Sequence, residues 1–481
     1  MATIQDTYFL NYDVALKEAQ KQNMITESMM QICYYDGELR EDGIKNLVNV
    51  PFDNMSSEFL IGNKRHPTKI SLQGLDLSIA VQADIIKSFQ ELMISVNKNI
   101  DVLGEQLIQE IKNQIIDFNE PLRFLICANR DTQVMQNISK EIADTLLSLG
   151  YDVRFELNDE LESMNIFRVV KSIYEYKPHV QIDINHIYGE YLNNDTFNFV
   201  WFQDGVPILM NNRAINLRKR DFLFHLTKGI ENFILHKGIT SSHQGFCINE
   251  NIYKKREAIK KEKKIVFIGS SYSDRIKQLK DDSDFDTIYK DALSIFESKS
   301  CLKSTAHEDS EIQYLMDKYN KEIGYINNIY GYLMRDYCVE KLCSIDTDYE
   351  IEIYGHNWTD NKIVKPYYKG VLQYGEDISK VYNSATYGYC PGGYVLMQRT
   401  LECAFSNTIP LVLDARADKQ DNYKMEIENG IQFFNINELE KVLSEDIDQT
   451  KNLDFIKKEY GYNNFIEKIL TIINKEIDCN K

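Results

Sequence analysis

Residues 387–413 read YGYCPGGYVLMQRTLECAFSNTIPLVL. An apolar run comes first and stops at a Pro-Gly-Gly turn, and a second apolar run ends the stretch. Continuous apolar runs of this length are typical of strands buried on both faces of a parallel sheet. The stretch therefore predicts a strand at 386–390, a helix at 394–406 and a strand at 409–414, which is the repeating unit of an open α/β sheet.

The same alternation extends through most of the chain. Between these short apolar runs, apolar residues recur at helical spacing, which predicts helices between the strands. The longest such interval predicts a helical insert at 289–342. The pattern indicates an α/β fold with two parallel sheets in tandem and a cleft between them, where ligands lie beyond the carboxyl ends of the strands. The other predicted strands are 122–128, 152–156, 180–185, 197–203, 265–270, 350–355, a short one around Val371, and 433–434.

This pattern divides the chain into four regions. Residues 119–258 carry the first sheet and residues 259–460 the second, and the last helix, in 461–481, is expected to cross back onto the first sheet. Residues 1–118 are predicted to be a mostly helical region, because apolar residues recur at helical spacing from 85 to 118. Residues 34–74, before that helix, mix turns with short possible strands. Three roles stay open for this region: a cap packed on the next domain, self-association into a homo-oligomer, or acceptor docking.

The composition excludes several classes of protein. The 481 residues carry a net charge of −18, which argues against a partner such as duplex DNA or an anionic membrane but not against an anionic ligand in a local basic pocket. Nine scattered cysteines without a C-x-x-C indicate reduced thiols rather than disulfides or a zinc site. No secretory signal is seen, and the longest uncharged stretch, 381–398, is too polar to be a transmembrane segment. A cytoplasmic protein is therefore expected.

The Pro-Gly-Gly turn suggests where an anion would bind. Free amides at a helix N-terminus favour phosphate oxygens, and Gly392 and Gly393 would let a phosphate approach closely. Arg399 and Glu402 are three residues apart and so share a helix face, where the carboxylate could hold a ribose diol. The alternative interpretation is a glycine turn beside a surface ion pair.

Several stretches together resemble the carboxyl-terminal half of GT-B glycosyltransferases, most closely the CgeB-like (spore-maturation-protein-B-like, glycosyltransferase group 1) family. The matching stretches are VFIGSSYSDR at 266–275, IYGHNW at 353–358, YKGVLQYGEDI at 368–378, RTLE at 399–402, and the pattern within 429–439. They span about 259–445; residues 177–204 match more loosely and 1–118 not at all.

The resemblance implies a GT-B fold, in which two Rossmann-like α/β domains face a cleft. It also implies a glycosyltransferase that moves a sugar from a nucleoside diphosphate, UDP- or GDP-linked, to an acceptor hydroxyl. The acceptor partner would be a bacterial surface glycan or a protein Ser/Thr. Such an enzyme would need no nucleic acid and no obligatory metal.

The resemblance also implies roles for individual residues. Glu402 would hold the donor ribose, and Arg399 and Arg275 would neutralise the diphosphate. The other residues implied at the donor site are Gly269, Ser270, His356, and the backbone of Gly392, Gly393 and Tyr394. Against these roles, Gly269 could be an ordinary strand-end turn and His356 an ordinary loop histidine. Tyr394 stands where many retaining relatives carry a glutamate, which leaves donor-sugar contacts and retention of configuration open.

A base for the acceptor hydroxyl is expected at the strand ends of the first sheet. The candidates are Asp204, Asp131 and His186, with His243 as a weaker one. Asp204 is preferred because the neighbouring Trp201 and Phe202 would partly desolvate it and raise its basicity. The alternatives are an Asp-Gly turn at Asp204 and a helix cap at Asp131. A retaining route would need no enzymic base.

Two other functions stay open. A sugar-nucleotide epimerase shares the two-sheet shape but needs a dense cluster of acids and histidines, which the sequence lacks. A non-catalytic sugar-nucleotide or glycan-binding protein is favoured slightly by the missing glutamate and opposed by Glu402, Arg399 and Arg275. A dehydrogenase is disfavoured because no G-x-G-x-x-G follows a strand.

Overall fold

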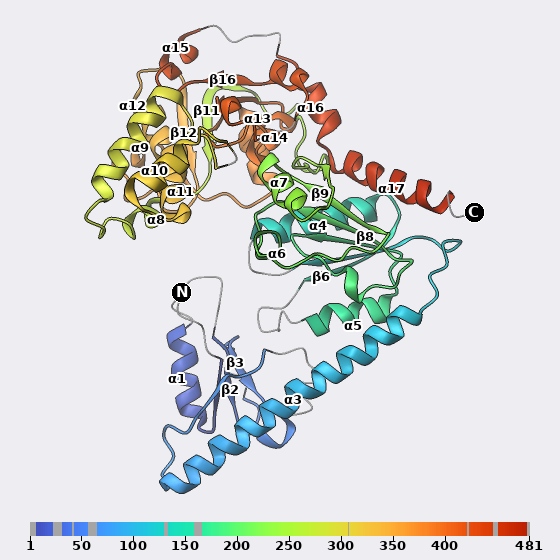
Figure 1. Cartoon of the computed structure of the whole chain (residues 1–481). Helices are drawn as coiled ribbons and strands as arrows, with labels where there is room; N and C mark the ends of the chain where they lie inside the picture. The colour runs from blue at the N-terminus through green and yellow to red at the C-terminus, as the bar shows by residue number, and fades with distance from the viewer. Residues whose placement is uncertain are drawn as a thin grey trace. The chain divides into compact units, whose positions relative to one another are not determined.

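The computed structural model is an α/β protein with three parallel sheets (Figure 1). It describes residues 6–22, 31–40, 43–55, 65–128, 133–157, 166–305, 307–420, 423–445 and 451–478. The chain divides into two compact units, one of residues 1–200 with 216–222 and one of residues 201–215 with 223–481. None of the helices in these described ranges combines the length and hydropathy needed to cross a membrane.

The amino-terminal region contains a sheet that the prediction of a mostly helical region omitted. Its strands are β1 (Thr7–Phe9), β2 (Cys33–Tyr35), β3 (Leu47–Asn49) and β4 (Lys69–Ser71), in the order β3-β2-β1-β4. Helix α1 (Tyr12–Gln22) packs on Phe9 and Tyr35, and the 35-residue helix α3 (Ile79–Asn113) packs on Tyr8 and Tyr34. Each strand has three residues, which is too short for a periodic pattern to reveal. Strands β2, β3 and β4 fall in the segment where short strands were expected, but their assembly into a parallel sheet with a helix on each face was not predicted.

The second sheet has the order β10-β9-β8-β7-β5-β6. Its strands are β5 (Arg123–Ala128), β6 (Asp152–Leu157), β7 (Val180–Ile184), β8 (Phe197–Phe202), β9 (Asp221–His225) and β10 (Ser242–His243). The first four confirm the predicted strands, whereas β9 and β10 were not predicted. Strands β7 and β8 are buried throughout, as expected for central parallel strands.

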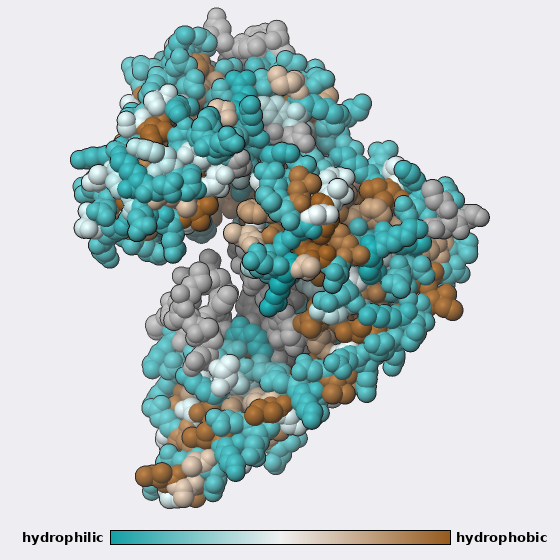
Figure 2. Space-filling view, in the orientation of Figure 1, coloured by the Kyte–Doolittle hydropathy of each residue, from teal (hydrophilic) through white to brown (hydrophobic). Residues whose placement is uncertain are grey.

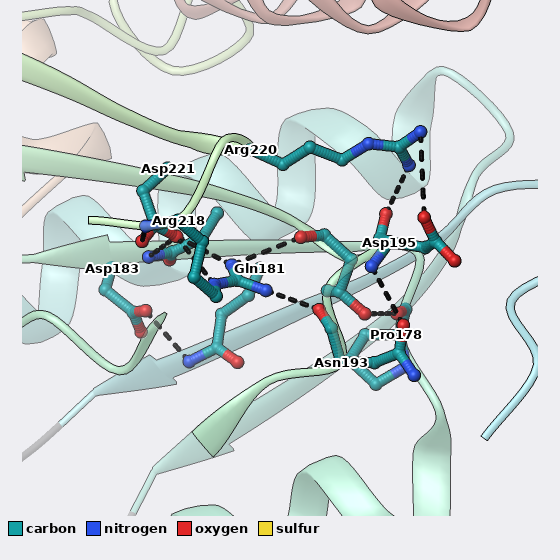
Figure 3. A network of polar contacts seen from close by, with 10 residues as sticks. Pro178, Gln181, Asp183, Asn193, Asp195, Arg218, Arg220 and Asp221 are labelled. Carbon is teal, nitrogen blue, oxygen red and sulfur yellow. Dashed lines mark hydrogen bonds and ion pairs between the residues drawn. The ribbon is translucent and has the colours of Figure 1, made fainter. Parts of the chain in front are cut away.

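A polar network lies within this sheet (Figure 3). Gln181 donates to the Asp183 carboxylate at 2.8 Å, and Asn198 donates to Asp221 at 3.1 Å. Arg218 pairs with Asp221 at 2.6 Å. Burial raises the pKa of Asp183 well above its usual range. The network leaves one side-chain oxygen each of Gln181, Asp183 and Asn198 buried without a hydrogen-bond partner.

The third sheet has the order β13-β12-β11-β14-β15-β16. Its strands are β11 (Glu262–Ile268), β12 (Glu350–Tyr354), β13 (Tyr368–Gly370), β14 (Ala385–Cys390), β15 (Ile409–Leu413) and β16 (Gln432–Phe434). The chain builds outward from β11 to β13, then returns to β14 on the other side of β11. The carboxyl ends of β11 and β14 therefore flank the topological switch point, where sheets of this kind bind ligands.

Helices cover both faces of the third sheet. The insert consists of α9 (Phe285–Lys299), α10 (Glu311–Tyr319), α11 (Ile323–Tyr332), the π-helix η3 (Leu333–Tyr337) and α12 (Cys338–Ser344), and confirms the predicted helical insert (Figure 1). It packs on Ile265 and Phe267. Helices α13 (Glu376–Ser384) and α14 (Gln398–Phe405) pack on the alternate residues, Val266 and Ile268.

Two predicted boundaries in this sheet are wrong. Val371 lies just outside β13, and α14 begins at Gln398 rather than Tyr394. The segment 391–397 is a loop, in which Val395 and Leu396 are buried without helical geometry. An apolar pattern alone does not distinguish a buried loop from a first helical turn.

The last helix, α17 (Tyr462–Asp478), contacts residues of β8 and β9. The Phe465 ring lies 5.2 Å from the Trp201 ring and 5.5 Å from the Phe224 ring, between centroids.

Hydrophilic residues predominate on the face shown in Figure 2. The eight cysteines of the described residues are all free thiols.

Candidate functional site

The loops that follow β11 and β12 are bonded to each other at the switch point. Ser271 N donates to the His356 carbonyl at 3.0 Å, and Trp358 Nε1 donates to the Gly269 carbonyl at 2.7 Å. Gly355 has a φ of 134°, and a Cβ on it would lie 2.2 Å from the Gly269 oxygen. Only glycine allows this approach at position 355, so Gly355 is needed for the close packing of the two loops.

Three arginines from three elements converge on this region. Arg275 is exposed on α8 (Ser273–Lys277), and its guanidinium carbon lies 4.1 Å from the centroid of the Tyr272 ring. Arg335 of the π-helix lies over the same ring at 3.9 Å. Burial lowers the pKa of Arg335. Tyr272 and Asp336 oppose this shift, and the positive charges of Arg275 and Arg399 make smaller contributions in the same direction as burial. Like charges gathered in this way favour an anion as ligand.

Sequence reasoning predicted Arg275 and Arg399 for this site but missed Arg335. Arg335 lies in the helical insert, which the sequence places between two strands without indicating which of its residues reach the strand ends. A π-helix has no sequence signature of its own. The one available signal was a charged Arg-Asp pair within an otherwise apolar helical segment.

Glu402 and Arg399 form a buried ion pair. The Glu402 side chain is fully buried, and its Oε2 accepts a hydrogen bond from Arg399 Nη1. Burial raises the pKa of Glu402, although the Arg399 charge opposes the increase. Arg399 is 33% exposed, and attraction by Glu402 outweighs the effect of burial and raises the pKa of its guanidinium. The alternative of a surface ion pair is therefore wrong.

The enclosure of Glu402 bears on its implied role. Its Oε1 atom is buried without a hydrogen-bond partner of good geometry. Tyr253, which is almost fully buried, and Gln398 favour the charged carboxylate. In this structure the Glu402 carboxylate faces other protein groups, and its ion pair with Arg399 orients the guanidinium of that residue.

The Pro-Gly-Gly turn does not form the expected phosphate cradle at a helix N-terminus. Gly392 and Gly393 precede α14 by several residues, so their amides are not its free N-terminal amides. A Cβ on Gly392 would lie 2.2 Å from Met397 Sδ, and one on Gly393 would lie 3.3 Å from Met334 Sδ. Close packing against two methionine side chains accounts for both glycines.

The predicted bases have different surroundings. Asp131 lies outside the described residues. Asp204 is exposed, so the expectation that Trp201 and Phe202 desolvate it is wrong. His186 is also exposed, with its Nδ1 2.9 Å from the Ile184 carbonyl oxygen.

His243 instead lies beside the predicted donor loop. It lines a small pocket together with Leu226, Thr227, Gly245, Phe246, Tyr394 and Leu396. Burial lowers the pKa of His243 to about 4, aided by the charges of His225 and Lys468, whereas Glu231 opposes the shift. The imidazole is therefore neutral near pH 7, and its lowered pKa makes it a weaker base than an ordinary histidine. His243, the weaker candidate from sequence, lines this pocket, whereas Asp204 and His186 are exposed.

Removal of His243 should reduce the acid sensitivity of folding. As the pH falls from 7 to 5, His243 takes up a proton in the unfolded chain near 6.5 but not in the folded one, whose pKa is about 4. Stability from the neutral ring is therefore present at pH 7 and lost as the pH falls. Wild type should lose about 2 kcal/mol more than His243→Gln over this interval.

Urea unfolding at pH 7 and pH 5 measures this difference. His236→Gln, at the exposed end of α7 (Lys228–His236), is the matched control and removes another histidine of the same unit. Identical pH dependence in wild type and His243→Gln would contradict a depressed pKa at His243.

No group of three His, Cys, Asp or Glu side chains within the described ranges is arranged to hold a metal ion. Burial raises the pKa of Asp336 to about 6, while hydrogen bonds from Ser271 Oγ and Tyr272 N favour its charged form. His356 is exposed on the loop after β12.

Comparison with known proteins gives remote structural likenesses. The sequence matches no protein-family model and no curated protein. AviGT4, a glycosyltransferase involved in avilamycin A biosynthesis, is 10% identical over 73% of this chain and 96% of its own, with a TM-score of 0.42. The glycosyltransferase VinC, solved in complex with dTDP, is 8% identical over 74% of this chain and 100% of its own, with a TM-score of 0.35.

TarM from S. aureus, in a complex that contains UDP, is 13% identical over 61% of this chain, with a TM-score of 0.31. This chain covers 55% of the length of that protein. All three TM-scores are below 0.5, so these likenesses assign neither a fold family nor an activity to this chain.

Proposed function

We propose that the chain is a GT-B-type glycosyltransferase that uses a nucleoside diphosphate sugar, uridine- or guanosine-linked. The observation that carries this proposal is the convergence of arginines at the switch point of the third sheet. Arg275 is exposed and forms no ion pair with a carboxylate of the described residues; it contacts the Tyr272 ring. A diphosphate would complete the hydrogen bonding of such guanidinium groups and neutralise their charge.

The proposed reaction is displacement at the anomeric carbon of the donor sugar. The acceptor oxygen bonds to this carbon, and the bond from the carbon to the diphosphate breaks with its electron pair going to the diphosphate oxygen. Arg275 and Arg399 stabilise the charge on the leaving diphosphate. In a direct displacement, the neutral imidazole of His243 takes the proton of the acceptor hydroxyl.

The proposal assigns the donor and the acceptor to different regions of the chain. Residues 259–460 would bind the donor and residues 119–258 the acceptor, which would be a bacterial surface glycan or a protein Ser/Thr. The free thiols support a cytoplasmic location. Tyr394, in place of a carboxylate, lines the pocket with His243 and would contact the transferred sugar.

Thermal unfolding with a panel of nucleotides tests the donor site. A ligand at 100 times its dissociation constant adds ~2.7 kcal/mol to stability, which would raise the unfolding temperature by about 5–10 °C. We expect UDP or GDP to produce this shift in wild type. Arg275→Gln should weaken the binding by about 10–100-fold, because one charge-assisted contact is lost.

Lys380→Gln is the matched control for this variant, since it removes an exposed cation on α13. The same protein is then incubated with nucleoside diphosphate sugars to detect release of the diphosphate. Absence of any nucleotide shift in wild type would refute the proposal. Nucleotide binding without turnover, with any acceptor offered, would instead support the non-catalytic alternative, which the tyrosine at 394 favours.

A further inference from the structure

The helical insert reaches the switch point through one irregular turn. Residues 333–337 form a π-helix between α11 and α12, whereas the flanking turns are α-helical. Leu333 is buried in the core of the third sheet. Single π-helical turns of this kind are frequent at functional sites because they redirect the side chains that follow.

This turn is attached to both loops that flank the switch point. Asp336 accepts hydrogen bonds from Ser271 Oγ and, at 2.9 Å, from Tyr272 N, both in the segment after β11. Met334 Sδ lies 3.3 Å from the position of a Cβ on Gly393, in the loop after β14. Residues on either side of Arg335 therefore fix its backbone between the two loops.

The Arg335 guanidinium retains hydrogen-bonding capacity. Its Nη1 donates to the Ser270 carbonyl at 3.2 Å, and its ring contact is with Tyr272. A guanidinium has five N–H donors, and the bond to Ser270 uses one donor of this half-buried side chain. Stacking on an aromatic ring holds the planar group in one orientation, which reduces the entropy lost when it binds an anion.

The charges around Arg335 also favour an anion. Two other guanidinium groups, of Arg275 and Arg399, raise the electrostatic free energy of the charged form. Asp336 is the neighbouring counter-charge, and it is already engaged by Ser271 and Tyr272. A diphosphate placed among the three arginines would remove this repulsion.

We propose that Arg335 binds the diphosphate of the donor and that the helical insert at 285–344 is part of the donor site. The inference rests on the proposed function, because it takes a nucleoside diphosphate as the ligand. It adds a third cationic ligand, from an element that neither the sequence pattern nor the resemblance assigns to the site.

Isothermal titration of wild type and Arg335→Gln with UDP, GDP and inorganic pyrophosphate tests this role. The variant should bind each ligand that wild type binds about 10–100-fold more weakly. Pyrophosphate should show the same loss of affinity, because it has no base or ribose and can test only the contact with the diphosphate. Lys341→Gln, on α12 of the same insert, is the matched control and should bind as wild type does.

The outcomes separate this inference from the proposed function. Wild-type affinity for all ligands in Arg335→Gln would overturn the role of Arg335 and leave the donor site intact. Failure of wild type to bind any of the three would overturn both. If Arg335→Gln does not fold, Arg335→Lys is measured: it keeps the charge but loses the fork of donors, so an affinity equal to wild type would overturn the inference.

Discussion

Replacing Glu402 by alanine should lower the free energy of unfolding by about 3–5 kcal/mol. The variant leaves the Arg399 guanidinium in a largely enclosed site without its counter-charge. It should also weaken nucleotide binding, because Glu402 no longer holds Arg399 in place. Urea unfolding gives the first quantity and titration with UDP or GDP the second.

The control for this variant is Glu376→Ala on α13. Glu376 is 57% exposed and pairs with Arg256 at 3.2 Å, so its removal should cost no more than about 1 kcal/mol. Equal costs for Glu402→Ala and Glu376→Ala would contradict a buried pair.

A double variant separates stability from binding at this pair. Arg399→Met combined with Glu402→Leu replaces two charges by apolar side chains, a change that is often neutral or stabilising in a buried setting. It should recover most of the stability lost by Glu402→Ala and none of the nucleotide affinity. Recovery of both would show that neither side chain contributes to the donor site.

The role of Glu402 toward the ribose has its own test. If the carboxylate holds the ribose, as the resemblance implies, wild type should bind a nucleotide that lacks the ribose hydroxyls more weakly than the parent nucleotide. Equal affinity would identify Glu402 as a positioning residue that orients Arg399, as its burial suggests.

Gly355→Ala should also destabilise the protein severely and lower the free energy of unfolding by more than about 4 kcal/mol. The residue combines a φ of 134° with a Cβ position 2.2 Å from the Gly269 oxygen, which is a backbone atom that cannot rotate away. The loops after β11 and β12 must separate to accommodate the methyl group. Nucleotide binding should be lost as well, because Tyr272 and Arg275 follow the first of these loops.

Gly370→Ala distinguishes steric conflict from backbone strain. Gly370 has a φ of 111°, but nothing lies within 4 Å of its Cβ position. Its substitution should therefore cost only the conformational strain, about 1–3 kcal/mol. Urea unfolding of both variants compares the costs, and similar values would contradict the close approach at Gly355.

The strands and helices of the two larger sheets were largely predictable because burial imposes a regular pattern on sequence. Residues 199–202 and residues 265–268 are apolar and buried on both faces of their strands, so these runs are visible in the sequence. Helix boundaries were less predictable where a loop is itself buried, as at 391–397. The three-residue strands of the amino-terminal sheet carry too little pattern to be detected.

The candidate site was predictable only in part. The pattern put Arg399 and Glu402 on the helix that follows a strand, and the resemblance suggested Arg275; the roles of all three stay predictions. Burial decides what each does: Glu402 is enclosed, whereas Asp204, expected to be desolvated, is exposed. The state of a carboxylate depends on neighbours that are remote in sequence, such as Tyr253 at Glu402.

The sequence by itself determined that this protein is an α/β protein with parallel sheets, because the periodicity of apolar residues records which elements are buried. It also determined that any anionic ligand must bind in a local basic site, since the net charge is −18. Only the tertiary structure decided which cations share that site. Arg335 and Arg275 are 60 positions apart, and they meet over Tyr272 because a π-helical turn and a strand-end loop are packed together. His243 and Tyr394 likewise line one pocket only once the chain is folded.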